Sequence, residues 1–332
     1  MQAAIDGFIV LNKLSRTNSF CIALLTCEEF QATNGTLDGV RTHMNGLEQI
    51  VRIRGGLHQG GFSAHLRRLI AWADLNSANA LSTAPRFPPL SDSHNLRTDQ
   101  FNIDPIAFQL YTTPASTSPT STTATTKPDF CIPIPNYSNV QVLTPKLAYC
   151  FLTLRQLSRL LNISGPKAVI RMDHTWYSDM AYTLQRRLMS LSSPNLPLSS
   201  GIERPCCLAA LIYLECCIRE IHPRSRIVET LVKDLKAALL KFKGRASRGM
   251  SNLVFWALAV GTAVSASGEP GLHTWFVVQL RALGRFLGVR GWEGARGILQ
   301  GILWPERESE LTRSLVWSEV EIEDASVDCW RD

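Results

Sequence analysis

The chain has 332 residues, of which 45% are hydrophobic and 19% charged, and its formal net charge at pH 7 is +6. This length permits one large or two ordinary domains, and the hydrophobic content permits a substantial core. The net charge is too modest for a dedicated nucleic-acid-binding domain unless it is concentrated in one place. Nine cysteines, an odd number, favour reduced thiols in a cytosolic or nuclear compartment.

Neither a signal peptide nor a membrane span is expected. Residues 8–11 form too short an apolar core for a signal peptide, and no small-residue cleavage site follows them. Residues 251–268 are uncharged, but their apolar part runs only from 253 to 264. Because a transmembrane helix needs ~20 mainly apolar residues, we expect a buried core helix there.

The chain is predicted to begin with helices. Residues 1–18 form at most a weak helix, and residues 19–33 form a better one with apolar residues at helical spacing. Asn34 and Gly35 mark a turn, so the second of these helices is expected to pair antiparallel with the helix that follows.

Residues 36–81 are predicted to form two amphipathic helices joined by a glycine-rich corner. Thr36 is suited to cap the first helix, and Gly55 to end it in the left-handed conformation. The first helix has one apolar face, formed by Leu37, Val40, Met44, Leu47 and Val51. The second has a face formed by Phe62, Leu66, Leu69, Ile70, Ala73 and Ala80, with Trp72 and Asp74 on its edges.

Residues 85–145 differ in composition from the rest of the chain. Ten of the seventeen prolines lie there, and residues 112–126 are almost entirely Thr, Ser, Pro and Ala. Such a stretch cannot bury enough apolar surface to offset ~1–2 kcal/mol of ordering entropy per residue. We predict a disordered linker or insertion, with a phosphorylated or partner-binding segment as the alternative.

Helical periodicity then resumes. Helices are predicted over residues 146–161, 173–191, 205–221, 224–242, 253–264, 275–287 and 292–303. No run alternates with a period of two, so no sheet is expected. The predicted fold is all-α, a multi-helix bundle or stack of antiparallel helix pairs. Residues 1–84 and 146–320 are the two parts of one domain, residues 85–145 are the insertion, and residues 321–332 are a tail.

The cysteines are not predicted to bind a metal ion. Cys206 and Cys217 lie on one predicted helix, where a rise of 1.5 Å per residue separates them by ~16 Å. Zinc-bound sulfurs each lie ~2.3 Å from the ion, so both doublets, 206–207 and 216–217, are expected to be buried apolar side chains. The repeated Cys-x-x-Cys spacing of a zinc cluster is also missing from this sequence.

Other catalytic and cofactor motifs are absent from the sequence. The glycines at 55, 56, 60 and 61 follow a helix and precede no Gly-Lys-Ser/Thr, so they indicate a helix–helix corner rather than a phosphate loop. The sequence contains no His-Glu-x-x-His, no Gly-x-Ser-x-Gly and no Asp-Asp-x-x-Asp. His43 is expected to be a partly buried structural residue. We therefore predict no catalytic, cofactor-binding or metal-binding residue.

Asp74 is expected to have a specific partner. It lies at the edge of an apolar face, where a half-buried carboxylate needs a compensating group. We hypothesise that Arg52 or Arg54 of the preceding helix supplies that group. The substitution Asp74→Asn is then expected to cost ~1–3 kcal/mol of stability.

Several of these motifs resemble a known family. The string His43-Met-Asn-Gly-Leu-Glu-Gln-Ile-Val-Arg-Ile-Arg-Gly-Gly56, followed by Leu69-Ile-Ala-Trp-Ala-Asp74, is similar to the helical regulatory domain of fungal zinc-cluster transcription factors. The resemblance covers roughly residues 20–81 and 205–320. The motif residues, to which it implies structural roles, are His43, Gly46, Leu47, Arg54, Gly55, Gly56, Trp72, Asp74, Trp275 and Trp292.

The resemblance implies a regulatory or effector-sensing domain of a nuclear transcription regulator. The family's zinc cluster is expected to be missing, through an incomplete gene model or a natural truncation, so no direct DNA binding is expected. The implied partners are proteins of transcription regulation, a second copy of the chain or a small-molecule effector, and no membrane or cofactor is implied. The alternatives are a scaffold or dimerisation protein that uses residues 275–304 as its face, and a helical enzyme.

A basic run lies near the end of the helix predicted at 224–242. Its members are Lys233, Lys236, Lys241, Lys243, Arg245 and Arg248, with only Asp234 against them. One hypothesis is that the run binds an acidic partner or acts as a nuclear import signal. The other is that these cations are placed at a helix C-terminus, where the helix dipole favours them. The run is too short to serve as a DNA-binding surface alone.

Overall fold

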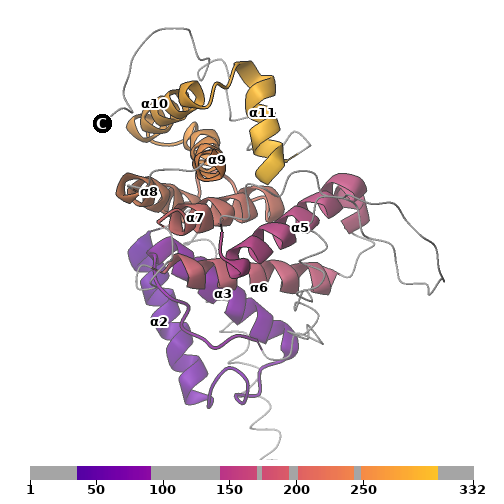
Figure 1. Cartoon of the computed structure of the whole chain (residues 1–332). Coiled ribbons are helices and arrows are strands. Elements are labelled where there is room, and N and C mark those ends of the chain that lie inside the picture. Colours follow the sequence, from indigo (N-terminus) through magenta and orange to yellow (C-terminus); the bar gives the residue numbers. More distant parts are fainter. Residues whose placement is uncertain (1–35, 91–142, 170–173, 194–200, 243–247, 306–332) are drawn as a thin grey trace, which may run out of the picture.

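The computed structural model describes residues 36–90, 143–169, 174–193, 201–242 and 248–305. Within these ranges the chain is helical and contains no strand, which confirms the predicted all-α class. The helices expected before residue 36 and most of the expected insertion lie outside the described residues. The described helices stack from α2 and α3 at one end to α10 and α11 at the other (Figure 1).

The first helix pair forms where the sequence predicts it. Helix α2 (Leu37–Ile53) begins after Thr36, whose side-chain oxygen accepts a hydrogen bond of 3.1 Å from the backbone N–H of Gly39. The corner then turns through Gly55 and Gly56 at φ values of +88° and +106°, a conformation that glycine adopts without strain. Helix α3 (Ala64–Leu81) follows and is buried along almost all of its second half.

Helix α7 (Glu203–Tyr213) lies at the centre of the stack (Figure 1). All of its residues except Arg204 are buried, because neighbours cover it on several sides. These neighbours are α5 (Pro145–Val169), α6 (His174–Ser192), α8 (Arg226–Lys241) and α9 (Arg248–Ser265). A helix in this position must be apolar all round, which accounts for the nearly all-apolar sequence. The helix continues directly into a π-helical turn, η2 (Leu214–Ile218).

Three predicted boundaries are wrong by five residues or more. Helix α9 begins at Arg248, five residues before its predicted start at 253. Helix α5 does not end near residues 162–165 but continues through Gly165 and Pro166 to Val169. A proline inside a helix loses one backbone hydrogen bond and its ring crowds the carbonyl four residues earlier, at a cost of ~3 kcal/mol; nothing in the structure explains why α5 continues past Pro166. Helix α10 (Pro270–Phe286) begins five residues earlier than predicted, with Pro270 in the first turn, where proline is favoured.

Helix α9 is the buried helix that the uncharged stretch predicts. Its Phe255 and Trp256 side chains are both 0% exposed. Among the described residues, no helix is long and apolar enough to cross a membrane.

Gly261 of α9 allows α10 to approach closely, because a Cβ atom at this position would lie only 2.3 Å from the ring of Phe276.

Replacing Gly261 by alanine should destabilise the protein. The new methyl group would overlap the buried ring of Phe276, and overpacking of this kind costs ~1–3 kcal/mol. The matched control is Gly297→Ala in helix α11 (Gly291–Ile302), where an added Cβ meets nothing within 4 Å. That change should instead stabilise the helix by ~0.5–1 kcal/mol. Urea unfolding of both variants measures the difference, and equal effects would contradict the packing argument.

Candidate functional site

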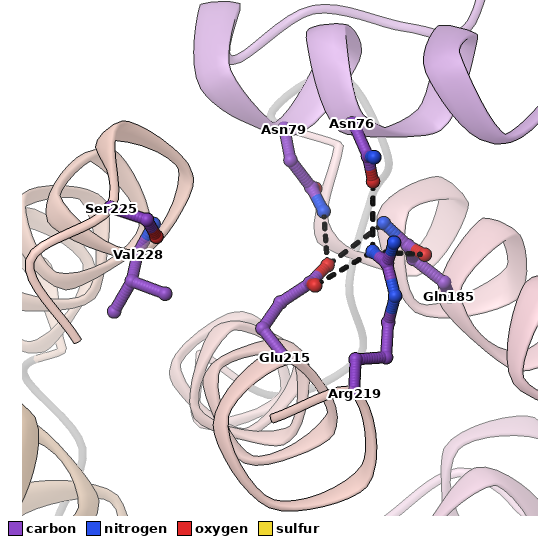
Figure 2. A network of polar contacts seen from close by, with 7 residues as sticks. All are labelled: Asn76, Asn79, Gln185, Glu215, Arg219, Ser225 and Val228. Carbon is purple, nitrogen blue, oxygen red and sulfur yellow. Dashed lines mark hydrogen bonds and ion pairs between the residues drawn. The ribbon is translucent and has the colours of Figure 1, made fainter. Parts of the chain in front are cut away.

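Buried polar side chains meet where α3, α6 and the π-helical turn converge (Figure 2). Glu215 is 0% exposed and lies at their centre. Its Oε1 atom accepts hydrogen bonds from Asn79 at 3.0 Å and Gln185 at 2.8 Å, and its Oε2 atom accepts one from Arg219 at 2.8 Å. These residues, together with Asn76, are called the Glu215 cluster below.

Arg219 is enclosed by the same elements. Its Nη1 atom donates to the side-chain oxygens of Asn76 at 2.8 Å and Gln185 at 3.4 Å (Figure 2). Its guanidinium carbon lies 4.2 Å from the centre of the Trp72 ring, a cation–π contact. Trp72 in turn meets Tyr182 of α6 edge to face at 5.8 Å. This one cation, at the residue that follows η2, therefore connects α3, α6 and η2.

The charge of Glu215 is compensated inside the protein. Burial raises the pKa of Glu215 above its ordinary value, and the charge and hydrogen bond of Arg219 act in the opposite direction. Both carboxylate oxygens accept hydrogen bonds from inside the protein, and the side chain has no exposed surface. The arrangement holds elements together and does not present a reactive carboxylate to solvent.

Asp74 has a different partner from the one hypothesised. Its two carboxylate oxygens accept hydrogen bonds of 2.8 Å each from the backbone N–H groups of Arg86 and Phe87. The hypothesis that Arg52 or Arg54 pairs with Asp74 is therefore wrong. Burial raises the pKa of Asp74, and the two backbone donors act in the opposite direction. Asp74 is also fully buried rather than lying at an edge.

The segment that Asp74 holds, residues 83–90, is called the strap. The guanidinium of Arg86 donates to Asn45 at 2.8 Å and to Glu48 at 2.9 Å, both on α2. The carbonyl of Phe87 accepts a hydrogen bond of 2.7 Å from Arg186 on α6. The strap therefore fastens α2, α3 and α6 to one another, although residues 85–90 lie within the predicted insertion.

With this geometry in place, the comparison with known families is decisive. The sequence model of the fungal specific transcription factor domain matches residues 10–332 of the chain. The chain belongs to this family. No curated protein and no solved structure matches it.

In this transcription factor domain, the motif residues of the first helix pair are mostly packing residues. Leu47 of α2 is buried, while His43 and Gly46 are half-buried. The guanidinium carbon of Arg54 lies 4.1 Å from the centre of the Phe62 ring, across the corner. Trp72 is the motif residue that contacts the Glu215 cluster, through Arg219.

The later motif residues of the domain lie elsewhere. Trp275 of α10 is partly buried, with the ammonium of Lys236 5.3 Å from its ring centre. Trp292 is partly buried on α11 and packs against the core. Neither tryptophan belongs to the Glu215 cluster.

The basic run is only partly described. Lys233 forms an ion pair of 2.8 Å with Glu229, one turn earlier on α8, and Lys241 lies in the last turn of that helix. Lys243, Arg245 and the side chain of Arg248 lie outside the described residues. The placement of Lys241 fits the hypothesis of a helix C-terminus that favours cations.

Three cysteines of the doublets, Cys206, Cys207 and Cys216, are buried in the core as predicted, and Cys217 is only partly buried against it. Cys206 and Cys207 lie in α7, and Cys216 and Cys217 lie in η2. Burial raises the pKa of Cys206 and of Cys207, which disfavours the thiolate form that binds metals. In the part of the chain that the structure describes, no group of three or more His, Cys, Asp or Glu residues could hold a metal ion.

None of the five residues of the Glu215 cluster is predicted from the sequence. Asn76, Asn79 and Gln185 are ordinary polar residues on other helices, and nothing local in the sequence marks them as partners of Glu215 and Arg219. A signal was present: Glu215 is the one carboxylate between Pro205 and Arg219 in an otherwise apolar run, and an arginine follows it four residues later. An acid in such a run must be buried with a partner.

Asp74→Asn should lower the free energy of unfolding by ~1–3 kcal/mol, since the amide can replace only one of the two acceptor oxygens. Arg52 is exposed, so Arg52→Ala should change the stability by no more than ~0.5 kcal/mol. Urea unfolding of the two variants makes the comparison. If Arg52→Ala lowered the free energy of unfolding as much as Asp74→Asn, the result would favour the Arg52–Asp74 pair and contradict the structure.

Removing the cation of the Glu215 cluster should be more costly. Arg219→Met leaves Glu215 buried with amide donors only, and an uncompensated buried charge costs ~3–5 kcal/mol at neutral pH. In the double variant Glu215→Gln/Arg219→Met no charge is left behind, so part of the stability should return. Denaturant unfolding at pH 7 measures both, and a double variant no more stable than Arg219→Met would contradict the charge argument.

The same variants should differ in their pH dependence. A carboxyl group whose pKa is raised in the folded state favours folding below its ordinary pKa, and this contribution is lost as pH rises through the folded pKa. Without Arg219 the pKa of Glu215 should rise further, so the stability deficit of Arg219→Met should shrink as pH falls from about 7 to about 4. The double variant should show no such trend. Asp74 is common to all three proteins, so its titration cancels in the comparison.

Proposed function

We propose that the chain is the regulatory part of a fungal transcription regulator, which acts in the nucleus by binding other molecules and does not catalyse a reaction. The single observation that carries this proposal is the family match over residues 10–332. Its output would be a contact with a protein of the transcription machinery, set by a protein or small-molecule effector. DNA binding by this chain itself is not part of the proposal.

The chemistry of the described residues supports a role in binding. Asp74 and Glu215 are buried carboxylates, a residue type that can act in catalysis. Each accepts hydrogen bonds from inside the protein with both of its oxygens. These hydrogen bonds connect segments of the fold: Asp74 binds the strap, and Glu215 binds α3 and α6. A domain built in this way can transmit binding at one surface to another, because its elements are connected by directional contacts.

A reporter assay tests the proposal. The full chain is fused to an unrelated DNA-binding domain and expressed in a fungal cell that carries the matching operator. Transcription should change severalfold relative to the DNA-binding domain alone, as a regulatory domain requires. The fusion with Arg219→Met should lose the effect, and Gly297→Ala, which touches nothing within 4 Å, should keep it. A fusion that never differs from the DNA-binding domain alone would overturn the proposal.

A dimerisation module is the other candidate, with residues 275–304 as the predicted face. Phe286, at the end of α10, is 67% exposed and favours such a face, whereas Trp304 is buried and Trp275 lies under Lys236. Light scattering on the purified chain separates the two candidates. A dimer that Phe286→Asp dissociates would support the module, and a monomer would exclude it.

A further inference from the structure

Helices α8 and α10 share an exposed face that is both basic and apolar. They both pack against α9, and the ammonium of Lys236 on α8 lies 5.3 Å from the ring centre of Trp275 on α10. Leu240 is one turn from Lys236 and 59% exposed, and Val278 is one turn from Trp275 and 51% exposed. We call these four residues the α8–α10 face; Lys241 follows Leu240 in the last turn of α8.

The charge of this face is not neutralised. Neither Lys236 nor Lys241 has a carboxylate partner in an ion pair within the described residues. Leu240 lies between these lysines in the sequence. An exposed leucine flanked by cations is suited to a segment in which acidic and apolar residues are interleaved.

The chain contains one segment of that composition. Residues 306–332 hold nine acidic side chains and three arginines, so their formal net charge is −6, whereas residues 1–305 carry +12. From Trp317 to Asp324 the order is Trp-Ser-Glu-Val-Glu-Ile-Glu-Asp, with acids alternating with apolar residues. The charge asymmetry between this segment and the rest of the chain favours their mutual attraction.

We propose that residues 306–332 dock on the α8–α10 face of the same chain. The acids around Val320 and Ile322 would pair with Lys236 and Lys241, and the apolar side chains would cover Leu240 and Val278. Trp317 lies twelve positions after Pro305, and extended chain spans up to ~3.3–3.6 Å per residue. The chain between them therefore reaches up to roughly 40 Å from Pro305. An acidic segment held in this way would be released by any partner that binds the face more tightly.

Carbodiimide cross-linking of the full chain, followed by mass spectrometry, tests the proposal. Carboxylates of residues 306–332 should be joined to Lys236 and Lys241 far more than to Lys146, an exposed lysine on α5. Acetylation of each lysine with a monofunctional reagent corrects for differences in reactivity. The cross-links should weaken in about 0.5 M sodium chloride, since salt screens exposed charges.

Two further arms make the outcome decisive. Leu240→Asp should lower the cross-link yield at both lysines on the order of tenfold, because it removes an apolar contact and adds repulsion. The control Ile53→Asp changes another exposed apolar side chain, on α2, and should have no effect. In a mixture of ¹⁴N- and ¹⁵N-labelled chains, cross-linked pairs should carry a single label.

Several results would overturn the proposal. These are equal yields at Lys146, yields unchanged by Leu240→Asp, no cross-links at all, or pairs of mixed label, which would assign the segment to a second copy of the chain. None of these depends on the reporter assay, so failure of the docking and failure of the proposed function are distinguishable.

Discussion

The ion pair between Glu215 and Arg219 is the contact on which the middle of the stack depends. Apolar faces alone tolerate repacking, so helices held only by such faces can settle in more than one register. The Glu215 cluster adds donors and acceptors from α3, α6 and η2 that meet in one arrangement. A π-helical turn, a feature often found at functional positions in helices, carries the carboxylate, and the arginine follows it directly.

Two other buried acids define where the predicted insertion leaves and rejoins the fold. Asp74 holds the backbone of Arg86 and Phe87 at its start, and Glu203 accepts a hydrogen bond of 2.9 Å from the backbone N–H of Thr144 at its end. Both anchoring carboxylates belong to the main helices, α3 and α7. The segments on either side of residues 91–142 are thus both hydrogen-bonded to helices of the described core.

The helices were predictable from the sequence because apolar spacing and glycines are local signals. Val40, Met44, Leu47 and Val51 are buried as their spacing indicates. The partners of the buried acids were not predictable in the same way. A search for cations suggests Arg52 or Arg54 for Asp74, but the actual donors are backbone N–H groups, which leave no trace in residue type. Asn79 and Glu215 are 136 positions apart, and only the tertiary fold brings them together.

Helix α8 connects the Glu215 cluster to the exposed α8–α10 face. On its inner side, the hydroxyl of Thr230 donates to the carbonyl of Ala80 at 3.2 Å, and Ser82 donates to Asp234 at 2.6 Å. These bonds hold α8 against the end of α3, whose Asn79 belongs to the cluster. The outer side of α8 carries Lys236 and Leu240. An occupant of that face would contact a helix that is hydrogen-bonded to α3. It would change the packing of the stack only if it bound one arrangement of these contacts more tightly than another.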